Sequence, residues 1–376
     1  MQNRTSFSIK NSTIALFAQI INIIISFITR TVFIYTLGAD YLGINGLFTN
    51  VLSMLSLAEM GLGTAIIYAM YRPLAIGDEK KTSALMNLYA KAYRIIGLII
   101  GIIGILLIPF LDYLINDQPN IPHLTIIYLL FLTNTVISYF FTYKRSIIIA
   151  SQHGYINTIN QLTFLIIQNI VQITLLIVFK QYLLYLMVQI VCTLSSNVAI
   201  STKADKMFPY LKRNQKERVD KQTKRQITKN VLAMMSNKIG SVVVTGTDNI
   251  LIAAFVGIYW VGLYSNYVLI VTTIKSLIMQ IMNAITASVG NLVASENNLK
   301  SFDIFKKIFF VNFVMTTFCS IFLYILLNPF IYLWIGQNYL LDENLVILIV
   351  ANFFIIQMRQ PAIVFIDTYG LFWQIK

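Results

Sequence analysis

Arg30 is the residue whose surroundings most clearly require a chemical explanation. It lies in the stretch IISFITRTVFIYTLG, residues 24–38, where every other residue is apolar, hydroxylated or aromatic. Gln19, Asn22 and Ser26 precede it at spacings that place all four residues along one stripe of a helix. Arginine presents a planar fork of donors that suits phosphate. The stripe therefore predicts that Arg30 faces protein or water rather than lipid, and that these four residues bind an anionic group.

Other ionisable side chains also fall within long apolar segments. They are the cations Lys238, Lys275 and Arg359 and the acids Glu59 and Asp248. Such residues are costly in lipid and usually face a bundle interior or an aqueous cavity. With Arg30 included, the cations exceed the acids by two, which favours an anionic ligand. The alternative is internal pairing, for example of Asp248 with Lys238 or Arg30. Either acid is also a candidate for exchanging H⁺ or Na⁺.

A row of side-chain amides marks the segment 155–179. The row consists of Asn157, Gln161, Gln168 and Gln172, which share one face of a helix. Amides on one face can bind sugar hydroxyls, but they also bond one helix to another. We favour helix bonding slightly. Cys192 and Cys319 lie inside apolar segments, where we expect small buried side chains rather than a metal site or a disulfide. No cofactor is expected.

The composition identifies the elements that must position these residues. Of the 376 residues, 57% are hydrophobic and only 11% are charged, and the mean hydropathy is +0.72. This predicts an all-α polytopic membrane protein, because a crossing helix needs about 20 mostly apolar residues. Ten helices are expected, over residues 12–36, 41–69, 87–113, 122–147, 155–179, 181–202, 230–256, 260–290, 305–335 and 344–368.

The positions of the basic residues predict the orientation. Of the 28 lysines and arginines, 23 fall at one side of the expected helices, whereas the other side holds only Lys180. Short cytoplasmic loops retain positive charge, so both termini are expected to be cytoplasmic. This topology also accounts for the net charge of +13, and we therefore expect no nucleic-acid partner. The long polar segment at 203–229 is expected to be a basic cytoplasmic linker.

Two short motifs recur at nearly the same offset. LGADYLG around Gly38 matches VGIYWVG around Gly257, and ILLIPFLDYLI from Ile105 matches ILLNPFIYLWI from Ile325. A duplication that spans six helices predicts two parallel bundles around a central cleft. The expected domains are a six-helix bundle over 1–202, the linker and a four-helix bundle over 230–376. On this reasoning the second bundle lacks two helices, so we expect the chain to be a fragment.

Three blocks of the sequence resemble a known family. They are TLGADYLGINGLFTNVLSMLSLAEMGLGTAIIYAMYRPLAIGDEKK from Thr36, TDNILIAAFVGIYWVGLYSNYVLI from Thr247 and RQPAIVFIDTYGLFWQ from Arg359. The chain resembles the polysaccharide transporters of the MATE-like (MOP) superfamily, the Wzx-type oligosaccharide flippases. The resemblance implies two helix bundles around a cleft, in the bacterial cytoplasmic membrane. This chain departs from the family pattern, because ten helices are expected in it whereas members of the family have twelve or more.

The resemblance implies a function. Such a protein flips polyprenyl-diphosphate-linked oligosaccharides across the bilayer for surface polysaccharide synthesis, and other polysaccharide-assembly proteins are expected partners. A MATE-type drug/cation antiporter is the main alternative, although it would favour an acidic cleft. A membrane polymerase or glycosyltransferase would need a large outer loop or a carboxylate cluster, which the sequence does not offer. A truncated, non-functional relative is a further alternative. We expect a transporter rather than an enzyme.

Overall fold

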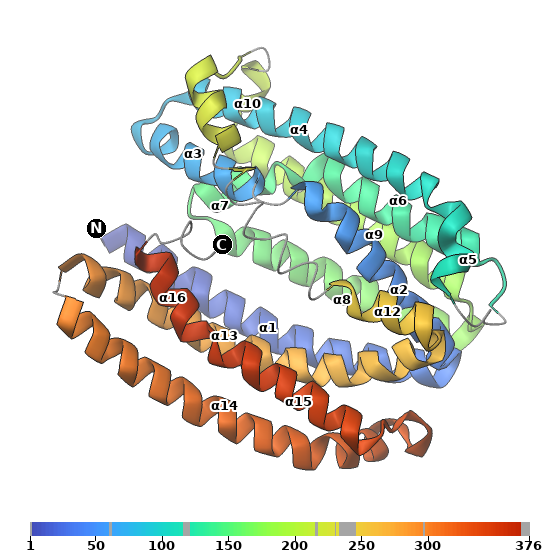
Figure 1. The fold of residues 1–376 in the computed structure, drawn as a ribbon. Helices are drawn as coiled ribbons and strands as arrows, with labels where there is room; N and C mark the ends of the chain where they lie inside the picture. The colour runs from blue at the N-terminus through green and yellow to red at the C-terminus, as the bar shows by residue number, and fades with distance from the viewer. Residues whose placement is uncertain are drawn as a thin grey trace. The chain divides into compact units, whose positions relative to one another are not determined.

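The computed structural model describes residues 2–59, 62–115, 121–214, 217–229, 231–232, 246–295 and 298–369. Within these ranges the chain forms helices and short turns and contains no strand (Figure 1). The expected all-α architecture is confirmed. The described contacts group into two compact units, Met1–Val261 and Gly262–Lys376. The domain boundaries expected at the basic segment 203–229 stay a prediction.

The first unit is a bundle of long helices joined by short breaks (Figure 1). Helix α1 packs against α8, α8 against α9, α9 against α6, and α6 against α4. The elements are α1 (Gln2–Leu37), α2 (Ala39–Leu55), η1 (Ser56–Glu59), α3 (Leu62–Ile76), α4 (Glu79–Leu106), η2 (Ile108–Phe110), α5 (Leu111–Leu114), α6 (Leu124–Thr142), α7 (Arg145–Ala150), α8 (Gly154–Phe179), α9 (Tyr182–Met207), α10 (Tyr210–Arg213) and α12 (Asp248–Phe255).

Glycines at the same place in the two repeated motifs mark helix junctions. Gly38 separates α1 from α2 with a φ of 86°, and Gly257 separates α12 from α13 (Ile258–Ser295) with a φ of 132°. Residues with side chains rarely adopt such positive φ angles, so each junction favours glycine. In both motifs a glycine with a positive φ thus marks a junction between two helices. The second pair differs, because η2 begins after Leu107 whereas α14 (Asn298–Ile335) continues through Pro329.

Glycines on α4 allow close packing against α6. A Cβ on Gly104 would lie 2.3 Å from Leu132 Cδ1, and one on Gly97 would lie 3.0 Å from Tyr139 Cβ. The Tyr128 hydroxyl donates to the Gly104 carbonyl at 2.9 Å. Small residues let helix backbones approach closely within a membrane. Gly97 and Gly104 therefore serve the packing of α4 against α6.

The second unit consists of the remainder of α13 together with α14, η3 (Gln337–Tyr339), α15 (Glu343–Met358) and α16 (Gln360–Tyr369). Helix α14 packs against both α15 and α16. Tyr267 is fully buried; its hydroxyl donates to Asn328 and accepts from the Leu341 backbone N–H at 2.8 Å. This cluster joins α13 and α14 to the turn before α15.

Seven helices among the described residues are long and apolar enough to cross a membrane, and α3 and most of α6 are shorter apolar helices. The expectation of a single helix over 41–69 was wrong, whereas the segment expected over 344–368 corresponds to one candidate span, Glu343–Ile366. The first segment contains α2, η1 and α3, and the second divides into α15 and α16. The helix expected over 122–147 ends at Thr142 and is followed by α7. Of the helix expected over 230–256, most lies outside the described residues.

Candidate functional site

Arg30 lies on the face of α1 that is opposite an exposed apolar stripe. That stripe consists of Phe17, Ile20, Ile24, Ile28 and Tyr35, all at least half exposed. At 3.6 residues per turn, Gln19, Ser26 and Arg30 point to the other side of the helix. Gln19, Ser26 and Arg30 are half-buried, whereas Asn22 is exposed and accepts a 3.5 Å hydrogen bond from Ser26. The apolar stripe suits lipid, so Arg30 is directed away from it.

A cluster of aromatic rings lies beside Arg30. The guanidinium interacts electrostatically with the Tyr185 phenol on α9. Tyr182 and Tyr185 stack on each other, and the ring edges of both contact Phe33 on α1. Tyr41 on α2 contacts Tyr182 in turn. Sequence reasoning did not identify these tyrosines, although Tyr182 and Tyr185 share one helix face at a spacing of three residues.

Amides on α8 hold the helices around Arg30 together. Thr29, which precedes Arg30, donates to Asn169 Oδ1 at 2.5 Å. Gln172 donates to the Tyr185 backbone carbonyl at 2.9 Å, and Gln168 donates to Gln172 at 3.3 Å. Asn157 donates to Gln161, one turn away, at 3.3 Å. Helix bonding thus accounts for Gln172, and Asn169, which was not in the predicted row, has the same role.

Glu59 lies at the end of η1 in a group of tyrosines. The Tyr93 hydroxyl donates to the Glu59 carboxylate, and the Tyr89 hydroxyl donates to Tyr93 at 2.9 Å. Tyr139 on α6 also interacts electrostatically with Glu59. All three rings are at most 4% exposed, whereas Glu59 is half-buried. The break between α2 and α3 therefore places a carboxylate among buried hydroxyl donors. The sequence pointed to Glu59 but not to its partners.

The remaining predicted residues are distributed over both units. Asp248 lies in the first turn of α12 in the first unit. Lys275, half-buried on α13, and Arg359, exposed at the junction of α15 and α16, belong to the second. Lys238 lies outside the described residues. Among the residues that the structure describes, no three His, Cys, Asp or Glu side chains gather as they would to hold a metal ion.

Arg145 is one of the basic residues that were counted in the sequence toward the orientation. The structure places it at the start of α7, where its guanidinium donates to Asn197 Oδ1 at 2.6 Å and to Ser196 Oγ at 3.4 Å on α9. Asn160 on α8 donates to the same Ser196 hydroxyl at 2.9 Å. Arg145 therefore joins α7, α8 and α9. Because its bonds go to neutral partners, it adds a positive charge to the interior of the first unit.

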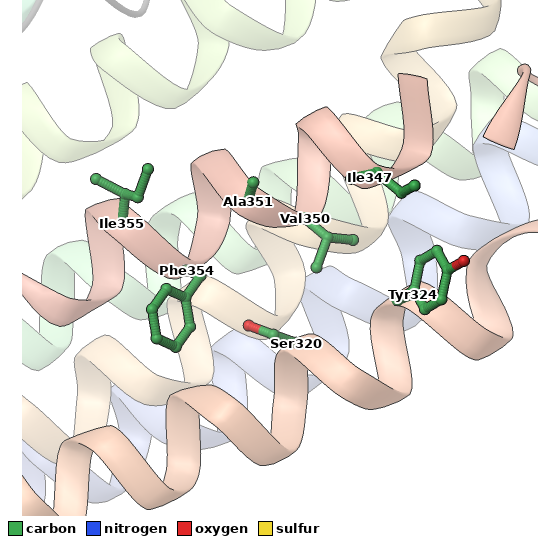
Figure 2. Close-up of a pocket in the computed structure, with 7 residues that line it drawn as sticks. All are labelled: Ser320, Tyr324, Ile347, Val350, Ala351, Phe354 and Ile355. Atoms are coloured by element: carbon green, nitrogen blue, oxygen red, sulfur yellow. The ribbon is translucent and has the colours of Figure 1, made fainter. Parts of the chain in front are cut away.

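An apolar groove runs between α14 and α15 within the second unit (Figure 2). It has a volume of about 570 Å³, and Figure 2 shows Ser320 and Tyr324 on α14 opposite Val350 and Phe354 on α15. The lining side chains carry few polar atoms, and the Ser320 hydroxyl, although buried, makes no hydrogen bond. The groove therefore suits lipid chains better than a polar ligand, because its lining offers few hydrogen-bonding groups that could orient such a ligand.

The fold is that of the MATE transporters. An inward-facing multidrug resistance MATE transporter of the MOP superfamily matches with a TM-score of 0.65 at 15% identity, over 94% of this chain and 83% of that chain. The bent form of the Vibrio cholerae MATE transporter VcmN matches at 0.60 and 12%, over 98% and 85%. A Pyrococcus furiosus MOP transporter, described as having a binding pocket of reverse polarity, matches at 0.55 and 16%, over 98% and 85%.

The sequence adds a family to this fold. Residues 8–286 match the model of the polysaccharide biosynthesis protein family, and the chain therefore belongs to that family. No curated protein matches the chain significantly. The family, the MATE-like fold and the apolar helices together support a multi-pass membrane transporter. The resemblance given by the three sequence blocks is thus confirmed.

Proposed function

We propose that this protein flips polyprenyl-diphosphate-linked oligosaccharides across the bacterial cytoplasmic membrane for the synthesis of a surface polysaccharide. The family supports the polysaccharide, and the MATE-like fold supports alternating access. The observation that carries the proposal is Arg30, a guanidinium on the face of α1 that is turned away from lipid. A diphosphate is the ligand that such a planar fork of donors suits best.

In this proposal the charged residues divide between ligand and coupling ion. Arg30 binds the diphosphate with Gln19, Asn22 and Ser26, and Lys238, Lys275 and Arg359 supply further positive charge. Glu59 or Asp248 exchanges H⁺ or Na⁺. The membrane potential assists outward movement of the diphosphate, because moving about two negative charges across 100 mV gains roughly 4–5 kcal/mol. Both termini lie in the cytoplasm, which follows from the placement of the basic residues.

Replacement of Arg30 in living cells tests this function. In a strain that depends on this gene for surface polymer, Arg30→Ala abolishes the polymer while the protein is still made and inserted. The control is Lys180→Asn, which removes the positive charge at an exposed left-handed position that asparagine tolerates. Normal polymer in the Arg30→Ala strain would remove Arg30 from the mechanism. Loss of polymer in both strains would indicate damage that is unrelated to the site.

A MATE-type drug or cation antiporter is the second candidate, because the first of the structural matches above is a multidrug transporter. Cells that lack their main drug exporters and express this protein distinguish the two candidates. The flippase proposal predicts no increase in ethidium resistance, whereas an antiporter lowers ethidium accumulation. The charge of the ligand is the physical basis of the distinction, since Arg30 repels an organic cation.

A further inference from the structure

A basic cavity lies at one end of the first unit, away from Arg30 along the helices. It has a volume of about 500 Å³ and lies between α4, the junction of α6 and α7, α9 and α10. Four cations, Lys91, Arg94, Lys144 and Lys212, line it together with a single carboxylate, Asp205. The cavity therefore carries a net charge of about +3. A cavity of this size holds a small polar ligand.

The carboxylate is already occupied by two of the four cations. Lys144 Nζ lies 2.7 Å from Asp205, and Lys212 Nζ lies 3.6 Å from it. In the part of the chain that the structure describes, Lys91 and Arg94 make no ion pair. They lie three residues apart on α4 and therefore share one face of the helix. Their charges are available to a ligand.

Hydrogen bonds form this cavity before any ligand arrives. Asn87, one turn before Lys91, donates its side-chain amide to the backbone carbonyls of Asn214 at 3.0 Å and Glu217 at 3.1 Å. Asn214 and Glu217 are thereby held against α4. The Asp205 and Lys144 side chains are only 15% and 19% exposed, so the opposite wall is also fixed. Tyr143 also lines the cavity and interacts electrostatically with Arg94 and Asp205.

The surface next to the cavity indicates what kind of molecule enters it. Immediately after Arg94, α4 exposes the apolar side chains Ile95, Leu98, Ile99 and Ile102. By helical geometry these residues continue the face that carries Lys91 and Arg94. A headgroup at Lys91 and Arg94 would leave its acyl chains along this apolar strip. Free phosphate has no apolar part that could contact this strip.

We propose that this cavity binds the phosphate of an anionic phospholipid headgroup, with Lys91 and Arg94 as the contacting cations. In the orientation proposed above, the cavity faces the inner leaflet, where anionic headgroups attract basic groups by about 1 kcal/mol per charge. Arg94 supplies a bidentate fork for the phosphate oxygens, and Lys91 supplies a point charge. The site is distinct from the residues proposed to bind the transported diphosphate.

Lipid binding to the purified full-length chain tests this proposal. The protein is exchanged into mixed micelles that contain equal amounts of phosphatidylglycerol and phosphatidylcholine, and bound lipids are counted by native mass spectrometry. The wild-type chain should retain phosphatidylglycerol in preference to phosphatidylcholine. K91Q/R94Q should lower that preference by roughly 30-fold, because two contacting charges are removed. The matched control K203Q/K206Q removes two exposed cations on α9 that do not line the cavity, and it should retain the preference.

A single variant and a competition with inorganic phosphate complete the experiment. If K91Q/R94Q does not fold, the single variant R94Q should show a smaller loss in the same direction. Inorganic phosphate at 10 mM should leave phosphatidylglycerol bound, whereas full displacement would identify free phosphate as the ligand and overturn the lipid assignment. An equal loss in K91Q/R94Q and K203Q/K206Q, or no preference in the wild-type chain, would also overturn it. Flipping activity is not needed for any of these readouts.

Discussion

The side-chain amide of Asn312 on α14 donates to the backbone carbonyl of Gln357 on α15 at 3.0 Å. This carbonyl lies four residues before Pro361, which has no N–H to donate to it. A neighbouring helix thus supplies the missing donor, which is how broken helices are tolerated in lipid. Pro361 accounts for the division of the segment into α15 and α16 at Arg359, and the Asn312 bond satisfies the carbonyl that the proline leaves without a helical donor.

A double-mutant cycle tests this account of the break. Asn312→Leu should lower the free energy of unfolding by about 1–3 kcal/mol, because the Gln357 carbonyl loses its buried donor. Pro361→Ala restores an N–H at that position, so in its presence the Asn312→Leu change should cost much less. Thermal unfolding of the purified variants measures both effects. If Asn312→Leu lowers the free energy of unfolding equally in the wild-type and Pro361→Ala chains, the Asn312 hydrogen bond does not replace the helical bond that Pro361 removes.

The Glu59 group leads to a prediction about pH. If Glu59 exchanges the coupling proton, Glu59→Gln should make flipping in proteoliposomes independent of an imposed pH gradient. Tyr93→Phe, which removes the hydroxyl donor to Glu59, should alter the dependence without abolishing it. Tyr128→Phe is the matched control, since that hydroxyl bonds to the Gly104 carbonyl away from Glu59. If flipping by the Glu59→Gln protein depends on the pH gradient as it does in the wild type, another acidic residue must couple the proton.

The proposed orientation can be checked by cysteine labelling. In a background that lacks Cys192 and Cys319, Gln181→Cys lies beside Lys180 on the expected outer side, and Lys221→Cys lies in the basic segment. A membrane-impermeant maleimide should label residue 181 in intact cells. It should label residue 221 only after the cells are permeabilised. The reverse pattern would invert the topology and place the basic cavity on the outer leaflet.

The aromatic neighbours of Arg30 provide a separate prediction. Tyr185→Phe removes the phenolic hydroxyl of the side chain that interacts with Arg30 but retains the ring contacts with Phe33 and Tyr182. It should weaken substrate binding several-fold with little change in thermal stability. Tyr185→Ala removes the ring as well and should lower the melting temperature by several degrees. If the two variants lower stability equally, the phenol has a structural role rather than one in the site.

Some of these structural features can be predicted from the sequence alone, each for a physical reason. Apolar length predicts a membrane helix directly, and the stripe of Gln19, Ser26 and Arg30 follows from the helical period. The break between α15 and α16 agrees with the missing N–H of Pro361, a residue that the sequence shows directly. In contrast, the division of the segment 41–69 at η1 involves no proline, and the pattern of apolar residues continues through it. The hydroxyl donors around Glu59 come from α4 and α6, so only the tertiary structure brings them together.

The basic cavity likewise could not be predicted from the sequence. Lys91, Arg94, Lys144 and Lys212 were counted in the sequence as basic residues that set the orientation. Their convergence depends on α10 folding back against α4 through Asn87, which has no sequence signal. Arg145 was treated in the same way, although its bonds to Asn197 and Ser196 place it within the bundle.

The most direct test of the central claim is flipping by the purified protein. Proteoliposomes are loaded with a fluorescent polyprenyl-diphosphate-linked sugar, and its appearance in the opposite leaflet is measured with a membrane-impermeant quencher. The wild-type chain and Lys180→Asn should flip the lipid, whereas Arg30→Ala should reduce the rate at least about tenfold, since a charged hydrogen bond is worth about 1.5–3 kcal/mol. Equal rates for wild type and Arg30→Ala would contradict the account.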